Sequence, residues 1–389
     1  MQFHDPNSRG SRIALKIVAV MFIFGAVMKF MQFTQGSTSN VTDATAGFHG
    51  PAQQLDTLQS IRQTAQDSIT FAQNMENPEQ YETQIECVRQ YMNDYDFIAQ
   101  TREIQSITTH NPVQRALGML NRHRQEYAVS NLQNTARNLD EQTKALLSAV
   151  DAAMSDDFSQ HAGQWLMQVD DATQVNELID RCGKNRSYQS MREMLTDLQS
   201  LQTLRSTVKQ QVTDAIANLH NSEQAAAMIP IPDQPNALDA NGWLAEAQSV
   251  AGTMGVQINE TDAMTCGNQQ ENDPSGLVAG YFCQTTDDGQ RNTVHLLTTH
   301  PDWNSTMQSP WLVDIVKHEL AHRSIMISCG TTQPAVTGGR TEAVTNSYSA
   351  LFLGADRGRI AAYQQTMPEY AMDEQSDQIA TAIHDGNCG

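Results

Sequence analysis

The spacing of apolar and polar residues divides the chain into a long helical region and a mixed region. From Ala52 to Met228 apolar residues recur at steps of three and four, which is the period of an amphipathic helix. Because a lone helix of this kind would leave its apolar stripe in water, we predict several antiparallel helices over 52–228 that form a bundle or coiled coil. We expect this bundle to be monomeric and to fold by itself. The most regular stripe consists of Met191, Met194, Leu198, Leu201, Leu204, Val208, Val212, Ile216 and Leu219.

A proline-rich segment at 229–236 separates this region from one with a different pattern. Its three prolines remove backbone donors and favour extended backbone, so a helix cannot continue through it. Beyond it, a helical run at Asp239–Thr253 precedes short strand-like runs and then a helix with Ser309 as N-cap and Pro310 as its first residue. We therefore predict an α+β domain over 237–389. The strand-like runs are Val256–Ile258, Gly276–Thr285 and Thr293–Thr299.

The first residues of the chain carry a pattern typical of a membrane span. Ile17–Met28 is an uninterrupted apolar run, and apolar residues on both sides extend it to 13–33 because the flanking lysines can snorkel. Cations concentrate before this run, so we predict a cytoplasmic tail at 1–12, a signal anchor at 13–33 and the bulk of the chain outside the cytoplasm. Cleavage of the segment as a signal peptide is the alternative and would make the protein secreted. Residues 34–51, rich in Ser, Thr and Gly, are predicted to form a flexible tether.

Composition narrows the choice of function. The formal net charge of −20 repels phosphate backbones, so no nucleic acid is predicted as a partner. A mean hydropathy of −0.47 excludes a membrane protein with many spans. Six cysteines in an exported chain predict three disulfides formed within domains. The predicted pairs are Cys87 with Cys182, Cys266 with Cys283, and Cys329 with Cys388.

The strongest chemical signal is the motif H-E-x-x-H, formed by His318, Glu319 and His322. Two histidines at i and i+4 lie on one face of a helix, so both imidazoles can reach one zinc ion. Glu319 can act as the general base for a water molecule beside that ion. A catalytic zinc takes three protein ligands, and the third separates the classes of peptidase that share this motif. Metzincins are excluded because Ile325 and Ser328 stand where that class needs Gly and His.

A candidate for the third ligand follows at a defined distance. Glu342 lies 20 positions after His322, in the context Glu-Ala-Val-Thr-Asn. This arrangement resembles the gluzincin metallopeptidases, in which a second helix at about this distance carries a glutamate ligand followed by Ala, Ile or Val, Ser or Thr, and Asp. The resemblance covers about residues 315–354. It implies a zincin-like domain in which His318, His322 and Glu342 bind zinc and Glu319 is the general base.

Two residues depart from the family pattern. Asn346 stands where the family has an aspartate, and its amide can still accept a hydrogen bond from a ligand histidine but raises that ligand's basicity less. Arg323 stands directly after His322, where the family has an uncharged residue. These departures keep open an alternative in which the domain no longer cleaves its substrate.

Two further features of a peptidase site have candidates in the sequence. A transition-state donor other than zinc would come from downstream of the motif, and for His384 a solvated position near the chain end is the alternative. The strand at Thr293–Thr299 precedes the motif's helix, as an edge strand that binds a peptide would, and an interior strand is the alternative. The candidate donors are His384, Tyr348, Tyr363 and Tyr370.

These features together predict a membrane-anchored metallopeptidase with Zn²⁺ as its cofactor. Its substrate would be a peptide or protein, and hydrolysis would take place outside the cytoplasm. The alternative is an extracytoplasmic helical scaffold that carries an inactive zincin-like domain. The intact set of three ligands and a base favours the enzyme, whereas the long helical region over 52–228 keeps the scaffold open.

Overall fold

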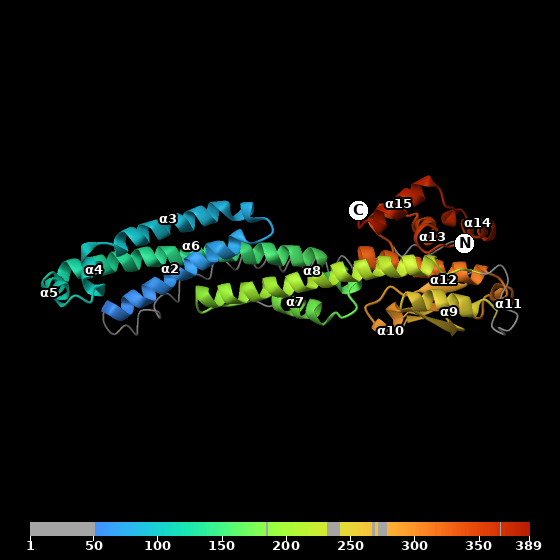
Figure 1. Ribbon diagram of the computed structural model, residues 1–389, viewed down its shortest axis with the longest axis horizontal. Helices are drawn as coiled ribbons and strands as arrows, with labels where there is room; N and C mark the ends of the chain where they lie inside the picture. Colours follow the sequence, from blue (N-terminus) through green and yellow to red (C-terminus); the bar gives the residue numbers. More distant parts are fainter. Residues whose placement is uncertain (1–50, 184–185, 232–241, 267–268, 271–277, 366) are drawn as a thin grey trace. The chain divides into compact units, whose positions relative to one another are not determined.

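A computed structural model describes residues 51–183, 186–231, 242–266, 269–270, 278–365 and 367–389. The fold is mainly helical and includes a small three-stranded sheet (Figure 1). The predicted cytoplasmic tail, the signal anchor and, except for Pro51, the tether lie outside the described residues. Of the helices that are described, none combines the length and apolar character that a bilayer crossing needs.

Helices fill the first part of the described chain, as the apolar periodicity predicts. The two longest are α6 (Arg122–Gln168) and α8 (Met191–Ala227). Local sequence sets where helices begin, and in α5 the side chain of Asn111 accepts a hydrogen bond from the backbone N–H of Val113 across Pro112. The remaining elements are α2 (Pro51–Gln73), a 3₁₀ turn at Pro78–Tyr81, α3 (Glu82–Ala99), α4 (Arg102–Thr108), α5 (Pro112–Leu120) and α7 (Thr173–Gly183).

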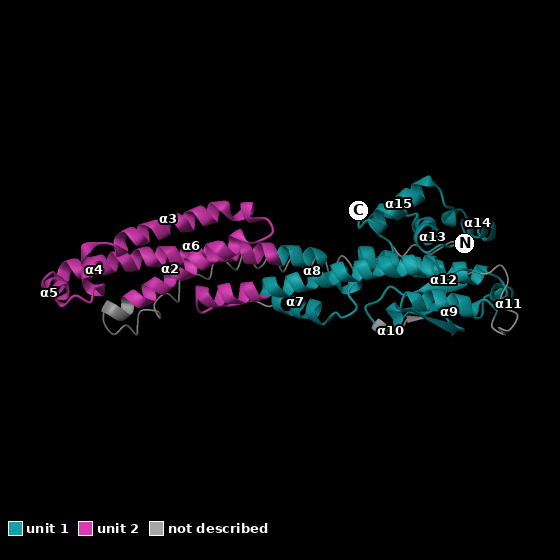
Figure 2. Ribbon diagram, in the orientation of Figure 1, with its two compact units in different colours: residues 1, 155–185, 201–389 teal, residues 2–154, 186–200 magenta. Residues whose placement is uncertain are grey.

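The chain forms two compact units (Figure 2). Unit 2 comprises residues 2–154 and 186–200, and its described part holds α2 to α5, the first part of α6 and the start of α8. Unit 1 comprises residues 155–185 and 201–389. Both boundaries run through long helices, so they differ from the boundary predicted at the proline-rich segment 229–236.

Apolar helix faces hold unit 2 together. Ile69 of α2, Val88 of α3 and Leu139 of α6 are all buried. Arg62 of α2 donates two hydrogen bonds, of 2.6 and 2.8 Å, to the carboxylate of Asp96 on α3. The bidentate geometry fixes how these two helices pack, which a single surface ion pair would not do.

The residues of the predicted bundle over 52–228 are divided between the two units, so the bundle is not one of these units, and its monomeric state and independent folding stay predictions. Leu219 of α8 is buried in the apolar core of unit 1, and the side chain of Gln168 at the end of α6 donates to the carbonyl of Ser328 at 3.0 Å. The stripe on α8 is largely buried, as expected, but it serves two cores. This happens because α8 is long enough to continue from unit 2 into unit 1. The spacing of apolar residues predicts that each turn is buried, but it does not tell which of the two cores buries it.

Unit 1 builds its sheet from short strands that lie beside α9 (Leu244–Thr253). The strand order is β1 (Gln257–Thr261), β5 (Thr293–Leu297) and β4 (Gly280–Phe282). β5 pairs parallel with β1 and antiparallel with β4. The remaining elements are β2 (Thr265–Cys266), β3 (Gln269–Gln270), α10 (Asp288–Arg291), α11 (Trp303–Met307), α12 (Trp311–Cys329), 3₁₀ turns at Ala335–Thr337 and Pro368–Tyr370, α13 (Thr341–Phe352), α14 (Arg357–Tyr363) and α15 (Glu374–His384).

This strand order decides between the two alternatives for Thr293–Thr299. β5 is the interior strand of the described sheet, so its interpretation as an edge strand is wrong. Its residues Val294 to Leu297 are all buried, which an interior position explains. The strand at the edge beside α12 is β4, which lies within the predicted run Gly276–Thr285 but was not predicted to be the edge strand.

Helix α12 is the centre of unit 1 and lies between α9 with the sheet on one side and α13 with α15 on the other (Figure 1). It begins at Trp311, one residue later than predicted, with Pro310 at the N-cap position. Because Pro310 has no N–H, the hydroxyl of Ser309 accepts instead from the backbone N–H of Trp311, at 3.2 Å.

Two of the three predicted disulfides are confirmed. Cys266 is bonded to Cys283, and Cys329 to Cys388. The predicted pair of Cys87 with Cys182 is wrong, because Cys87 is a free thiol whose Sγ lies 3.3 Å from Gln142 Oε1. The two residues belong to different units, each with its own core.

Candidate metal centre

Helix α12 presents His318 and His322 on one face, four residues apart. Apart from Trp311 and His322, every residue of the helix is buried, so packing on all sides holds the two imidazoles in place. The helix ends at Gly330, whose φ of 73° is left-handed. A side chain there would also meet the backbone of α6, since a Cβ would lie 2.7 Å from Gln164 Cα.

Helix α13 brings Glu342 to the same point from its first turn. Its Oε2 lies 3.1 Å from His318 Nε2 and 3.4 Å from His322 Nε2. The two imidazole rings are 4.8 Å apart at an interplanar angle of 86°, and their Nε2 atoms face the same carboxylate oxygen. We call these three residues the ligand trio; they are the three that the gluzincin resemblance implies as ligands.

A hydrogen-bond chain fixes the orientation of the first imidazole. Asn346 Nδ2 donates to Gln364 Oε1 at 2.7 Å and to the carbonyl of Tyr370 at 2.9 Å. With its nitrogen committed to these acceptors, the amide turns its Oδ1 toward His318 Nδ1, 2.7 Å away. Nδ1 of that ring is therefore the donor, and Nε2 faces Glu342. Asn346 thus makes the contact with a ligand histidine that the sequence predicts for it.

The second imidazole is held in a similar way. The hydroxyl of Thr345 donates to the carbonyl of Thr341 at 2.9 Å, so it accepts from His322 Nδ1 at 3.4 Å. In both histidines the nitrogen that points away from the trio is a donor to α13. The Nε2 atoms are left to face Glu342, which is the arrangement that metal-binding imidazoles adopt.

Burial and charge act against each other in the trio. Burial acts to raise the pKa of Glu342, but the two imidazoles outweigh it and hold that pKa well below its usual range. Burial acts to lower the pKa of His318, but the hydrogen bond to Glu342 and the charge of Glu319 raise it to about 9. The site therefore favours positive charge between the two rings and the carboxylate.

The donor set of the trio suits zinc. Two imidazole nitrogens and one carboxylate oxygen are the ligands of catalytic zinc sites, which keep a further position open. All three donor atoms lie within 4.8 Å of one another, and the side chains are between 11% and 24% exposed. Such a site is shielded on the protein side and still reachable from solvent. By its chemistry and its geometry, the trio fits a zinc ion.

Glu319 belongs to α12, and its side chain lies next to the edge strand β4. Its pKa is raised by burial, against the opposing charges of His318 and His322. The backbone of β4 comes unusually close at Gly280, where a Cβ would lie 2.9 Å from Ile315 Cγ2 and 3.3 Å from Glu319 Cγ. A larger residue at this position would force the Ile315 side chain to shift, so glycine lets the edge strand lie against the helix that carries the candidate base.

Arg323, one of the two departures from the family pattern, points away from the trio. It is buried and donates to the carbonyl of Arg291 at 3.2 Å and to Asn292 Oδ1 at 2.8 Å. Arg291 in turn donates to the carbonyl of Met167, in the last turn of α6, and to that of Val169, directly after the helix. The guanidinium after His322 is therefore engaged in packing inside unit 1.

Three of the four predicted transition-state donors are engaged elsewhere. Tyr348 is fully buried and donates to Glu223 Oε1 at 2.8 Å, and His384 Nε2 lies 3.3 Å from Glu223 Oε2. Tyr363 stacks on Trp311. Tyr370 is different: its ring centroid is 5.8 Å from that of His318, and its carbonyl holds Asn346.

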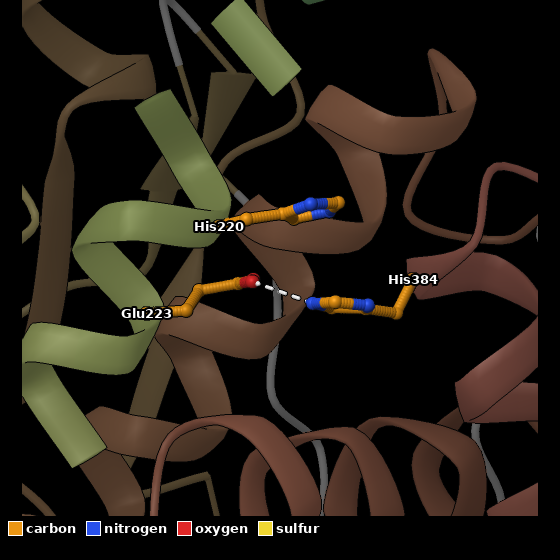
Figure 3. Close-up of side chains that lie close together, drawn as sticks. All are labelled: His220, Glu223 and His384. Atoms are coloured by element: carbon orange, nitrogen blue, oxygen red, sulfur yellow. Dashed lines mark ion pairs between the residues drawn. The ribbon is translucent and has the colours of Figure 1, made fainter. Parts of the chain in front are cut away.

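A second group of the same residue types lies elsewhere in unit 1. His220 and Glu223 of α8 meet His384 of α15 (Figure 3). The rings of His220 and His384 are 3.9 Å apart and nearly parallel, at 16°, and Phe352 stacks on the other face of His384. We call His220, Glu223 and His384 the stacked cluster.

His220 and Glu223 are not among the site residues predicted from the sequence. The signal that could have found them is their spacing on α8. Three residues apart, the histidine and the glutamate lie on one face of that helix. Their partner His384 lies more than 160 positions away, which no local pattern reveals. Comparisons of the chain with protein-family models, curated proteins and solved structures gave no match.

Proposed function

We propose that this protein is a zinc-dependent peptidase, anchored in the membrane by residues 13–33, whose unit 1 hydrolyses peptide bonds outside the cytoplasm. The observation that carries the proposal is the convergence of His318, His322 and Glu342 beside the buried carboxylate of Glu319. The sequence motif supplies only the spacing, and the three-dimensional convergence comes from packing of α12 against α13.

Zinc would be held by the trio. When bound, it would act as a Lewis acid that makes a neighbouring water a better nucleophile and polarises the scissile carbonyl. The contributions of the chain's own residues are distinct from this. Asn346 and Thr345 fix the two imidazoles by their outward nitrogens, so the ligands need no reorganisation.

Glu319 would take the proton from the attacking water and pass it to the leaving amine. Burial raises its pKa, which makes the carboxylate a better proton acceptor than an exposed one. Gly280 allows β4 to pack against α12 beside Glu319. The side chain of Glu319 therefore lies next to the edge strand, on the same helix as the two histidines.

Strand β4 offers a way to hold the substrate. Within the described sheet it is an edge strand, and it runs antiparallel to β5. An extended peptide that added to this edge would form backbone hydrogen bonds and lie next to Glu319. This would suit a substrate recognised by its main chain.

Tyr370 is the best-placed candidate for a donor to the developing oxyanion. Its ring lies near His318, and its backbone is tied to Asn346, so it belongs to the surroundings of the trio. Replacement of Tyr370 by phenylalanine tests this role. It would lower kcat and leave zinc content unchanged.

The disulfides support the expected location outside the cytoplasm. Cys266–Cys283 and Cys329–Cys388 lie in unit 1, and such bonds persist in oxidising compartments. A reporter enzyme that is active only after export, fused to the C-terminus of the full chain, tests the orientation. We expect this reporter enzyme to be active. The location would be contradicted if it were inactive while a reporter that works only in the cytoplasm, fused at the same place, were active.

The decisive experiment compares the wild-type chain with Glu319→Gln and His322→Ala. Zinc content would be measured by mass spectrometry and hydrolysis with a library of quenched fluorescent peptides. We expect Glu319→Gln to keep one zinc per chain and lose hydrolysis, because the ligands are intact and the base is gone. His322→Ala should lose both.

Glu260→Gln, at an exposed glutamate of β1, is the matched control and should change neither quantity. Stoichiometric zinc in a chain that carries Glu342→Ala and His322→Ala together would reject the ligand assignment. A wild-type chain that binds zinc through the trio but cleaves no peptide of the library would favour the inactive scaffold.

A further inference from the structure

Unit 2 carries a concentration of exposed apolar side chains. Of the nine large hydrophobic residues that are exposed in the described part of the chain, six lie between Phe97 and Tyr127. Leu120 is 81% exposed and Met119 75%. Single exposed apolar residues are ordinary, but a concentration of them in one stretch of the chain points to an interaction surface. We call these six residues the α5 surface: Phe97, Val113, Leu117, Met119, Leu120 and Tyr127.

The packing of α5 keeps this surface turned outward. Val113, Leu117 and Leu120 stand at i, i+4 and i+7, so they share one face of the helix. The helix is held from another side, at Gly118, where a Cβ would lie 2.3 Å from Gln125 Nε2 and 2.7 Å from Ser106 Oγ. The close contact at glycine fixes α5 on its neighbours and leaves the apolar face unused.

The charge around the α5 surface is opposite in sign to that of the whole chain. Residues 97–127 contain four arginines, two glutamates and no lysine or aspartate, whereas the chain as a whole has a net charge of −20. All four arginines are exposed, and within the described residues none forms an ion pair. The arginines are Arg102, Arg115, Arg122 and Arg124.

A shallow depression lies within the same surface. Its volume is about 520 Å³, and its lining includes Phe97 and Tyr127, the cationic Arg124 and one carboxylate, that of Glu103. Apolar walls beside a guanidinium suit a ligand that is apolar at one end and anionic at the other. A phospholipid has this chemistry.

We propose that the α5 surface binds a phospholipid bilayer that contains anionic headgroups. A helix with leucines on one face and cationic side chains around it is typical of segments that lie in the bilayer interface. Charge argues against a second copy of the chain as the occupant, because two surfaces of net positive charge would be brought together. An anionic bilayer matches both the apolar face and the arginines.

A local fluorescent reporter tests the proposal in the full chain. The substitution Leu120→Trp places an indole at a position that is 81% exposed and so tolerates it. With vesicles of phosphatidylglycerol whose acyl chains are brominated, we expect the added emission to shift to the blue and to be quenched. The four native tryptophans give a background that the wild-type chain measures. The added emission comes from position 120 alone. Insertion of another segment of the chain into the bilayer would therefore not produce the same blue shift and quenching.

Two matched variants sharpen the test. Leu351→Trp, at an exposed leucine of unit 1, should show neither shift nor quenching. Adding Arg122→Gln and Arg124→Gln to the reporter chain should weaken partitioning roughly 30-fold, at about 1 kcal/mol for each arginine at an anionic surface.

Three outcomes would overturn the proposal. The first is an absence of quenching with anionic vesicles. The second is equal quenching with pure phosphatidylcholine, which would remove the role of charge. The third is a blue shift without vesicles that grows with protein concentration, because it would assign the surface to self-association.

Discussion

Unit 1 holds two clusters of identical residue types, each with two histidines and one glutamate. In the ligand trio the imidazole planes meet at 86°, and their Nε2 atoms face the same carboxylate oxygen. In the stacked cluster the planes lie at 16° and the rings face one another, 3.9 Å apart. An ion is bound in the plane of an imidazole, so parallel stacked rings cannot share one unless a ring turns.

The two clusters also differ in which of their groups the neighbouring side chains hold. The outward nitrogens of His318 and His322 are held by side chains of α13. In the stacked cluster the partners act on the carboxylate instead, because Tyr348 donates to Glu223 and leaves one oxygen for His384. Burial, and then the charge of His384, lower the pKa of His220, so this ring tends to stay neutral. Residue type alone therefore does not define a metal site; ring direction and the partners of the outward nitrogens do.

The largest expected effect separates the clusters by metal content. We predict one tightly bound zinc per chain, held by the trio. His322→Ala should remove it and His384→Ala should leave it in place, because His384 stacks between Phe352 and His220. Equilibrium dialysis with zinc followed by mass spectrometry measures the content. A second tight equivalent that His384→Ala removes and His322→Ala keeps would show that the stacked cluster binds metal too.

The difference between the ligand trio and the stacked cluster explains why the sequence predicted the first and not the second. Helical geometry converts the spacing of His318 and His322 into proximity, and Glu342 could be named only because its distance and context resemble those of the gluzincin glutamate. Asn346 could be assigned from the same resemblance, since it stands where the family has its aspartate, one turn beyond Glu342 on α13. The stacked cluster joins α8 to α15, so it depends on tertiary packing that no periodicity encodes.

Other differences between prediction and structure have the same cause. The role of Arg323 depends on Asn292 and on the end of α6, which meet it only in the folded chain. The strand at Gly280–Phe282 was predicted, but its place at the edge beside α12 depends on strand order, which no local pattern encodes. The length of α8 was predictable, but its division between two cores was not.

The second prediction concerns the covalent link between the helices of the two clusters. Cys329 ends α12, which carries the trio's histidines, and Cys388 follows α15, which carries His384. This bond closes a separation of 59 residues. In the chain-entropy model, replacing both cysteines by serine should lower the free energy of unfolding by about 4 kcal/mol.

Chemical denaturation under oxidising conditions measures this loss. The matched control is the same replacement at Cys266 and Cys283, a separation of 17 residues, with an expected loss of about 3 kcal/mol. Both variants should keep zinc, because the ligands lie on α12 and α13. Loss of zinc in the Cys329 variant alone would show that the trio depends on α15.

The smallest effect is expected at Asn346, the outward partner of His318. Asn346→Leu removes the acceptor of the ring's Nδ1 proton, so zinc affinity should fall roughly 10- to 100-fold. Asn346→Asp restores the family's residue and should retain zinc, but here the new carboxylate would face the carbonyl of Tyr370 and the Oε1 of Gln364. Gln364 can turn its amide, whereas the carbonyl cannot, so stability should fall by about 1 kcal/mol. Competition with a zinc-binding dye measures affinity and thermal unfolding measures stability, with Asn304→Leu at an exposed site of α11 as the control. If Asn346→Asp bound zinc more tightly and unfolded no earlier than the wild type, the amide's two donated hydrogen bonds would not be what selects asparagine at this position.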